Sequence, residues 1–306
     1  MGFKKRVIVG IPTKDRGIEL CLLIQSLMYQ TYQDFDILIY NDCHTNLLYE
    51  NKTINSLFNL VIETGHDLKL IIGERRGPHV GGQRILENSE GYEFILRLDD
   101  DVAPEPTFIE ELLNVFDTYP NVAAVGPIYI DPHTSIKDQW IPKNIQRDEV
   151  IERCKVKWFG NELFLTGWAQ TNQHYDMTPI PTEHLNSGFM YKRDVGLEIG
   201  GYFMDLSIAG HREESDFSYR MFRQGYNLYI CPSALAWHFH PMFGGIRETM
   251  GNHHSKINWD HDEKLFLERM EKWLPKEKAI VDSSMISVIC LTHGTDHAKL
   301  RDLLQD

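Results

Sequence analysis

The sequence lacks a long apolar segment. Its longest uninterrupted apolar stretches lie around residues 7–11 and 122–130, and both are far shorter than the roughly 20 residues that a membrane-spanning helix needs. The first six residues lead directly into a strand-like segment, without the apolar region of a signal peptide. We therefore expect no transmembrane segment and a cytoplasmic location.

Basic residues and closely spaced cysteines are also scarce. Lys and Arg number 31 against 44 Asp and Glu, a net charge of −13. This balance argues against duplex nucleic acid as a main ligand, because phosphate neutralisation needs a basic face. The five cysteines have no short C-x-x-C spacing, so neither a zinc knuckle nor a disulfide framework is indicated.

What the chain does contain is apolar material, at 42% of its residues, arranged in two periodicities. Strand-like runs cover residues 7–11, 36–40, 68–72, 93–98, 122–130 and 227–231. Helical patterns cover residues 20–28, 83–88, 107–119, 213–224 and 262–274. This alternation predicts an α/β fold with one open, twisted, mainly parallel sheet flanked by helices.

Three adjacent carboxylates, Asp99, Asp100 and Asp101, directly follow the run at 93–98. They repel one another unless a cation offsets their charge. If side chains alternate in direction, Asp99 and Asp101 can reach one metal ion while Asp100 faces elsewhere. Oxygen ligands favour Mg²⁺ or Mn²⁺. The alternative is a solvated acidic turn, but open α/β sheets place ligands at the carboxyl ends of their strands.

Two histidines, His238 and His240, share one face of an extended segment. One imidazole together with two carboxylates makes a mixed nitrogen and oxygen site that suits Mn²⁺. Taken alone, a histidine in this chain of 14 is more often structural, so the metal hypothesis depends on the combination with the acidic triplet.

Acidic residues also gather at the predicted start of the helix near 213–224. The helix dipole favours negative charge there, which is the structural explanation. The functional one is a general base that takes a proton from an acceptor hydroxyl, oriented by Arg220. Glu213, Asp216 and Arg220 share a face, whereas Glu214 projects about 100° away and can address a pocket.

Taken in their order along the chain, the motifs of about residues 6–245 resemble those of the family 2 glycosyltransferases with the GT-A fold. Residues 8–13 resemble the opening nucleotide-binding strand and turn, and residues 39–42 resemble the second strand, with Asn41 in place of the first of two usual aspartates. Residues 81–84 resemble a helix start with an arginine near the diphosphate, although Gln83 and Ile85 depart from the usual residues. The resemblance implies a donor-binding role for Pro12, Thr13, Arg16, Asp42, Arg84 and Asp100.

The catalytic residues follow from the same resemblance. The acidic triplet is similar to the D-x-D metal motif, and residues 213–216 match the E-D-x-D helix start with Glu214 in the position of the base. The metal ligands would be Asp99, Asp101 and His238, holding Mn²⁺ or Mg²⁺. Glu214 and Asp216 would be the catalytic residues, although the sequence leaves open whether Glu213, Glu214 or Asp216 is the base.

The resemblance implies an inverting transfer of a sugar from a nucleoside-diphosphate sugar, a UDP-sugar, to a glycan or other hydroxyl acceptor. Two alternatives stay open. A sugar nucleotidyltransferase would need a Gly-rich basic loop after the first strand, which residues 14–17 fit only loosely. A non-catalytic glycan-binding domain on the same fold would be expected to have lost its carboxylates.

The predicted organisation has three parts. Residues 1–245 form the catalytic domain, and residues 246–284 form a C-terminal helical extension. Residues 285–306 repeat the strand, turn and helix start of residues 7–27, which indicates the start of a second, similar domain. The alternative is a C-terminal strand and helix that pack on the first domain.

Overall fold

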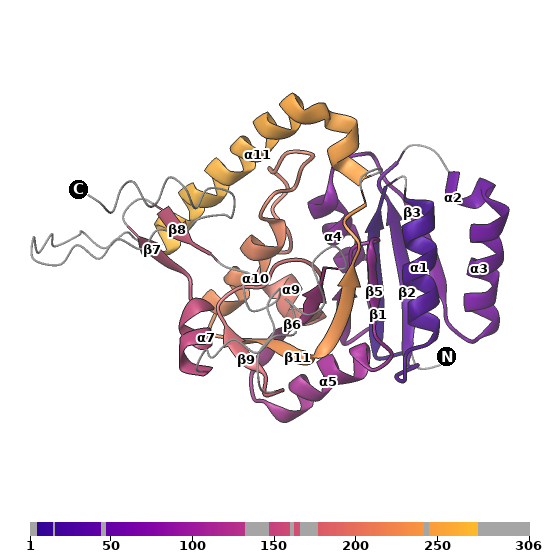
Figure 1. The fold of residues 1–306 in the computed structure, drawn as a ribbon, viewed down its shortest axis with the longest axis horizontal. Coiled ribbons are helices and arrows are strands. Elements are labelled where there is room, and N and C mark those ends of the chain that lie inside the picture. The colour runs from indigo at the N-terminus through magenta and orange to yellow at the C-terminus, as the bar shows by residue number, and fades with distance from the viewer. Residues whose placement is uncertain are drawn as a thin grey trace, which may run out of the picture. The chain divides into compact units, whose positions relative to one another are not determined.

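The computed structural model describes residues 5–14, 16–43, 47–131, 147–159, 162–165, 177–241 and 245–274. All of them belong to one compact unit, Met1–Pro275. Its centre is a sheet with helices packed around it (Figure 1). The sheet has nine strands in the order β3-β2-β1-β4-β10-β6-β11-β5, with β9 beside β11. The predicted second domain at 285–306 lies outside the described residues, and the domain boundaries stay a prediction.

The first part of the sheet is parallel, as the sequence predicts. It consists of β1 (Val7–Thr13), β2 (Phe35–Asn41), β3 (Leu68–Ile72) and β4 (Phe94–Arg97). Strands β1, β2 and β4 are buried over almost their whole length. Continuous apolar runs are typical of a parallel sheet that helices cover on both faces. All four carboxyl ends therefore meet at one edge.

The second part of the sheet is mixed. Its members are β5 (Val102–Pro104), β6 (Val122–Ile130), β9 (Ile180–Thr182), β10 (Phe189–Lys192) and β11 (Asn227–His238). Strand β11 runs parallel to β6, whereas β10 is antiparallel to both β4 and β6. Strands β5 and β9 are antiparallel to β11. A separate two-stranded sheet joins β7 (Lys157–Phe159) to β8 (Glu162–Phe164).

Helices cover the two faces of the sheet. Their bounds are α1 (Gly17–Met28), α2 (Leu47–Glu50), α3 (Lys52–Glu63), α4 (Pro78–Glu87), α5 (Phe108–Thr118), α7 (Arg147–Arg153), α9 (Arg193–Glu198), α10 (Glu213–Arg223) and α11 (Gly245–Trp273). Val7, Val9 and Ile11 of β1 pack into one core with α1, α3 and α5, whereas Ile8 packs into a second core with α4, α9 and α10. This alternation is the period of two that a strand imposes on its side chains.

Helix α11 is longer than the apolar stripe at 262–274 predicts, because it begins at Gly245. The added turns are rich in polar residues, so apolar periodicity could not reveal them. Phe266 and Met270 of its second half pack with Val156 and Tyr219 in a small third core. Among the described residues, no helix combines the length and apolar character that a membrane span requires.

Candidate active site

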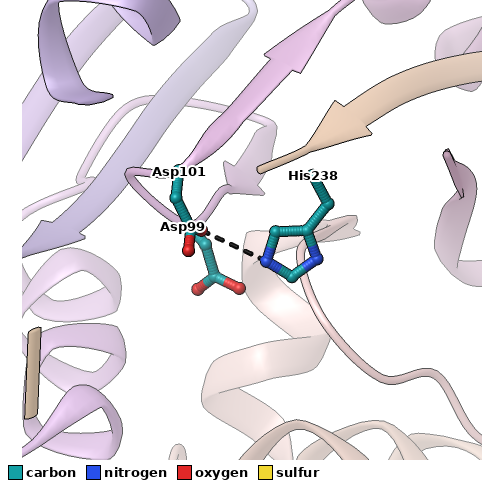
Figure 2. Close-up of side chains that lie close together, drawn as sticks. All are labelled: Asp99, Asp101 and His238. Atoms are coloured by element: carbon teal, nitrogen blue, oxygen red, sulfur yellow. Dashed lines mark ion pairs between the residues drawn. The ribbon is translucent and has the colours of Figure 1, made fainter. Parts of the chain in front are cut away.

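The acidic triplet lies at the carboxyl edge of the sheet, in the turn between β4 and β5. Strand β11 pairs with β5 so that His238 is opposite Val102, which brings the imidazole next to Asp101. His238 Nε2 is 3.2 Å from Asp101 Oδ1. Figure 2 shows the carboxylates of Asp99 and Asp101 close together with the imidazole facing them from another strand.

These three side chains could hold a cation. One ligand atom from each of Asp99, Asp101 and His238 lies within 4.8 Å of the other two. Two carboxylate oxygens and one imidazole nitrogen fit Mn²⁺ or Mg²⁺ by donor type. Burial of Asp101 opposes its ionisation, but the hydrogen bond and charge of His238 and the charge of Arg16 prevail and lower the pKa of Asp101. The ionised form is the one that binds a metal.

Asp100 turns to β1, away from this cluster. Thr13 Oγ1 donates to Asp100 Oδ2 at 2.6 Å, and Arg16 Nη1 lies 3.0 Å from Asp100 Oδ1 and 2.8 Å from Asp101 Oδ2. Burial raises the pKa of Asp100 to about 7, against the opposing charge of Arg16. Thr13, Arg16 and Asp100, which the sequence assigns to the donor, are therefore in direct contact.

Arg97, the last residue of β4, links the triplet to α10. Its side chain is 1% exposed, and its Nη1 lies 2.9 Å from Asp99 Oδ1 and 2.7 Å from Glu214 Oε1. Its Nη2 lies 2.6 Å from Glu213 Oε1. The sequence pattern gives Arg97 no role, but the signal is present: a lone charge in a buried apolar run needs a partner.

The carboxylates at the start of α10 differ in exposure. The side chain of Glu214 is 19% exposed, against 2% for Glu213 and 3% for Asp216. Burial raises the pKa of both Glu214 and Glu213, although the charge of Arg97 opposes the rise in each. Of the three, Glu214 is therefore the one that an external molecule can best reach.

Asp216 points to a different set of partners. Its Oδ2 lies 3.1 Å from Arg220 Nε, and its Oδ1 lies 3.6 Å from Arg269 Nη1 of α11. Burial raises the pKa of Asp216 to about 6 despite these two guanidinium groups. The side chain of Asp216 thus lies between α10 and α11, whereas that of Glu214 bonds Arg97.

The other donor-side candidates also lie around α4 and the ends of the strands. Asp42, directly after β2, accepts hydrogen bonds from the backbone N–H groups of Arg76 (2.9 Å) and Gly77 (2.7 Å), and so fixes the start of α4. Pro12 of β1 packs against Gly81 of α4. Arg84, further along α4, is half exposed and bonds Glu87 on its own helix at 2.6 Å.

The family model described as "Glycosyl transferase family 2" matches residues 8–194. The chain is 23% identical over 213 residues to glucosyl-dolichyl phosphate glucuronosyltransferase of Haloferax volcanii, which covers 68% of this chain and 59% of that protein. It is 23% identical over 245 residues to chondroitin synthase of Escherichia coli, with 76% and 34% covered. The chain therefore spans less than two thirds of either curated relative.

Two solved structures share the fold. GalNAc-T7, in complex with UDP, GalNAc and Mn²⁺, matches with a TM-score of 0.60 and 15% identity over 91% of this chain and 53% of that one. The mannosyltransferase PcManGT of Pyrobaculum calidifontis, in complex with GDP-Man and Mn²⁺, matches with a TM-score of 0.51 and 15% identity over 78% and 58%. At this identity the likeness shows the GT-A fold.

Proposed function

We propose a reaction for this chain, because it belongs to glycosyl transferase family 2 and is therefore a glycosyltransferase. It transfers a sugar from a UDP-sugar to a hydroxyl of a glycan or other acceptor, with inversion at the anomeric carbon. Two observations support a nucleotide-sugar donor: the related folds bind UDP or GDP-Man with Mn²⁺, and the acidic cluster offers ligands for such an ion. Family membership disfavours the nucleotidyltransferase and the non-catalytic glycan-binding alternatives. A cytoplasmic location is part of the proposal.

In this proposal, Asp99, Asp101 and His238 hold Mn²⁺ or Mg²⁺. The ion, when bound, stabilises the negative charge that develops on the leaving diphosphate. Arg16, held between Asp100 and Asp101, adds a second positive charge beside that position. Pro12, Thr13, Asp42, Arg84 and Asp100 contribute to the donor side, where Thr13 and Asp100 keep Arg16 in place.

We assign Glu214 as the general base. The observation that carries this assignment is that a single guanidinium nitrogen of Arg97 bonds both Asp99 and Glu214, which brings the base to the edge of the metal cluster. Glu214 takes the proton of the acceptor hydroxyl as its oxygen attacks the anomeric carbon. The new glycosidic bond forms while the bond to the diphosphate breaks, and UDP leaves. Asp216 supports the helix through Arg220 and Arg269.

Replacement of the base tests the proposal. Glu214→Gln keeps the shape of the side chain but cannot take the proton, so we expect turnover to fall by about 10² to 10⁴ fold. The assay is UDP release over a panel of nucleotide sugars with Mn²⁺, and calorimetry of UDP with Mn²⁺ should show unchanged affinity. Glu63→Gln, at the exposed end of α3, is the control with full activity.

Unchanged turnover of Glu214→Gln would remove this residue from the role of base. If the unaltered chain releases no UDP from any nucleotide sugar, the proposed function itself is wrong.

A further inference from the structure

Helix α11 lies outside the residues that the family model matches, yet it holds the loop that leads into α10. The carboxylate of Asp262 is fully buried and accepts three hydrogen bonds from this loop. Ser207 donates its backbone N–H at 2.6 Å and its hydroxyl at 2.8 Å, and His211 donates its backbone N–H at 2.9 Å. One buried side chain of α11 thus fixes both ends of the segment 207–211.

The next residue of α11, Glu263, binds the end of the same loop. Its carboxylate accepts from Arg212 Nε at 2.8 Å and Nη2 at 3.3 Å, and lies 3.1 Å from His211 Nε2. Burial opposes ionisation, but His211 and Arg212 together lower the pKa of Glu263 to about 2. The side chain is therefore a carboxylate at neutral pH and can hold the guanidinium.

Arg212 needs such support because of its backbone. Its φ of 69° lies in the left-handed region, which is unfavourable for a residue with a Cβ atom. Arg212 also directly precedes α10, and its carbonyl accepts from the backbone N–H of Asp216 at 2.9 Å. The orientation of this residue therefore sets the first turn of α10, on which Glu214 lies.

Arg269, two turns further along α11, adds a third connection. It lies 3.6 Å from Asp216 and also pairs with Asp205. Helix α11 is thus bonded to the loop before α10 and to α10 itself, on both sides of Glu214 in the chain. None of these contacts involves Asp99, Asp101 or His238, on which the donor side depends.

We propose that Asp262 and Glu263 are positioning residues for the transfer: they fix residues 207–212, and thereby aim Glu214 at the acceptor. The inference depends on the proposed function, in which Glu214 is the base. It makes α11 part of the catalytic unit and assigns to this helix a function beyond packing.

The test separates positioning from folding. For Glu263→Gln and Asp262→Asn, the rate of UDP release with Mn²⁺ present is compared with that of the unaltered chain. The donor is the nucleotide sugar from which the unaltered chain releases UDP fastest. We expect kcat to fall roughly 10- to 100-fold, the loss typical of a misplaced catalytic group. The KM for the donor and the affinity for UDP with Mn²⁺ should stay within about 2-fold, because uniform binding is untouched.

Arg212→Gly tests whether kcat can fall without a loss of stability, which a merely structural role would not produce. Glycine tolerates the left-handed backbone, so the unfolding temperature should stay close to that of the unaltered chain, whereas kcat falls with the lost Glu263 contact. The double variant Arg212→Gly with Glu263→Gln should be no slower than the slower of the two single variants, because each single change already removes the contact between Arg212 and Glu263. Asp260→Asn, exposed on the same helix, is the matched control with full kcat.

Glu263→Gln and Arg212→Gly carry the test if Asp262→Asn does not fold, since neither removes a fully buried group. Full kcat in both folded variants overturns this inference while leaving the proposed function intact, provided that Glu214→Gln is slow. Full turnover of Glu214→Gln overturns the assignment of the base and, with it, this inference.

Discussion

A single buried charge, that of Arg97, connects the residues around the site. Arg97 carries a guanidinium into the interior at the end of β4, and the carboxylates of Asp99, Glu213 and Glu214 surround it. A buried charge is tolerated only when its partners offset the cost of desolvation. Because these partners come from a turn and from a distant helix, Arg97 couples the position of a metal ligand to that of the proposed base.

His79 allows a test of burial at the residue scale. It lies in the first turn of α4, is 1% exposed, and has a pKa that burial lowers to about 4. The unfolded chain, with a histidine pKa of about 6.5, binds a proton more readily, so stability falls as pH decreases from about 6.5 to about 4. The loss amounts to about 3 kcal/mol at the acid end.

We therefore expect His79→Gln to reduce the pH dependence of the free energy of unfolding in this window, measured by urea unfolding between pH 4 and pH 7. Asp216 and Asp100 titrate in both chains, so the difference between the two curves isolates His79. His261→Gln, at an exposed position of α11, should leave the slope unchanged. If the free energy of unfolding depends equally on pH in His79→Gln and in the unaltered chain, burial does not lower the pKa of His79.

At the scale of elements, α4 packs closely against the sheet and its neighbours through glycines. A Cβ at Gly81 would lie 2.9 Å from Pro12, and one at Gly82 would lie 2.7 Å from the ring of Tyr202. That ring is itself stacked on Phe217 of α10, with centroids 4.1 Å apart and planes inclined by 5°. Helix α4, which begins beside Asp42, and α10, which carries Glu214, are thus held in contact by one aromatic pair.

Gly82→Ala should therefore destabilise the protein, although alanine is the better helix former. Helix propensity alone favours alanine by about 1 kcal/mol, but overpacking against Tyr202 costs about 1 to 3 kcal/mol. Urea unfolding should show a lower midpoint for this variant. Asn59→Ala, on the exposed side of α3, has no such contact and should raise the midpoint slightly. A stabilised Gly82→Ala would show that α4 can move away from Tyr202.

At the scale of the whole molecule, an acidic chain with a net charge of −13 has to accept an anionic donor. Two guanidinium groups lie where the donor is proposed to bind, because Arg97 and Arg16 pair with the acidic triplet. These pairs offset part of the repulsion among the carboxylates. We therefore expect the fold to persist without a bound cation, whereas the proposed reaction needs one.

Removal of divalent cations should distinguish the cation requirement of the reaction from that of the fold. With EDTA, we expect UDP release to be lost while the unfolding temperature stays unchanged. Adding Mn²⁺ back should restore release and raise the unfolding temperature, because a ligand that binds only the folded state stabilises it. UDP release that persists with EDTA would exclude the metal from the reaction. Unfolding on chelation would instead show that the cation is structural.

The sequence by itself determines several strands and helices and the acidic residues at one strand end. The apolar run at 68–72 forms β3 within the same limits, and the runs at 7–11 and 36–40 lie within β1 and β2. Local sequence is sufficient here, because a short, continuous apolar run is typical of a strand in a parallel sheet that helices cover on both faces. The acidic triplet is similarly visible, since three neighbouring carboxylates at a strand end need no distant information to be noticed.

Only the tertiary structure decided which distant groups meet. The antiparallel direction of β10 depends on how the chain returns to the sheet, and the position of His238 depends on the register of β11 with β5. Arg97 and Glu213 are 116 residues apart in the chain, and Asp262 is 55 residues from Ser207. Such contacts have no periodic signal, because they arise from the packing of whole elements and not from the spacing of residues within one.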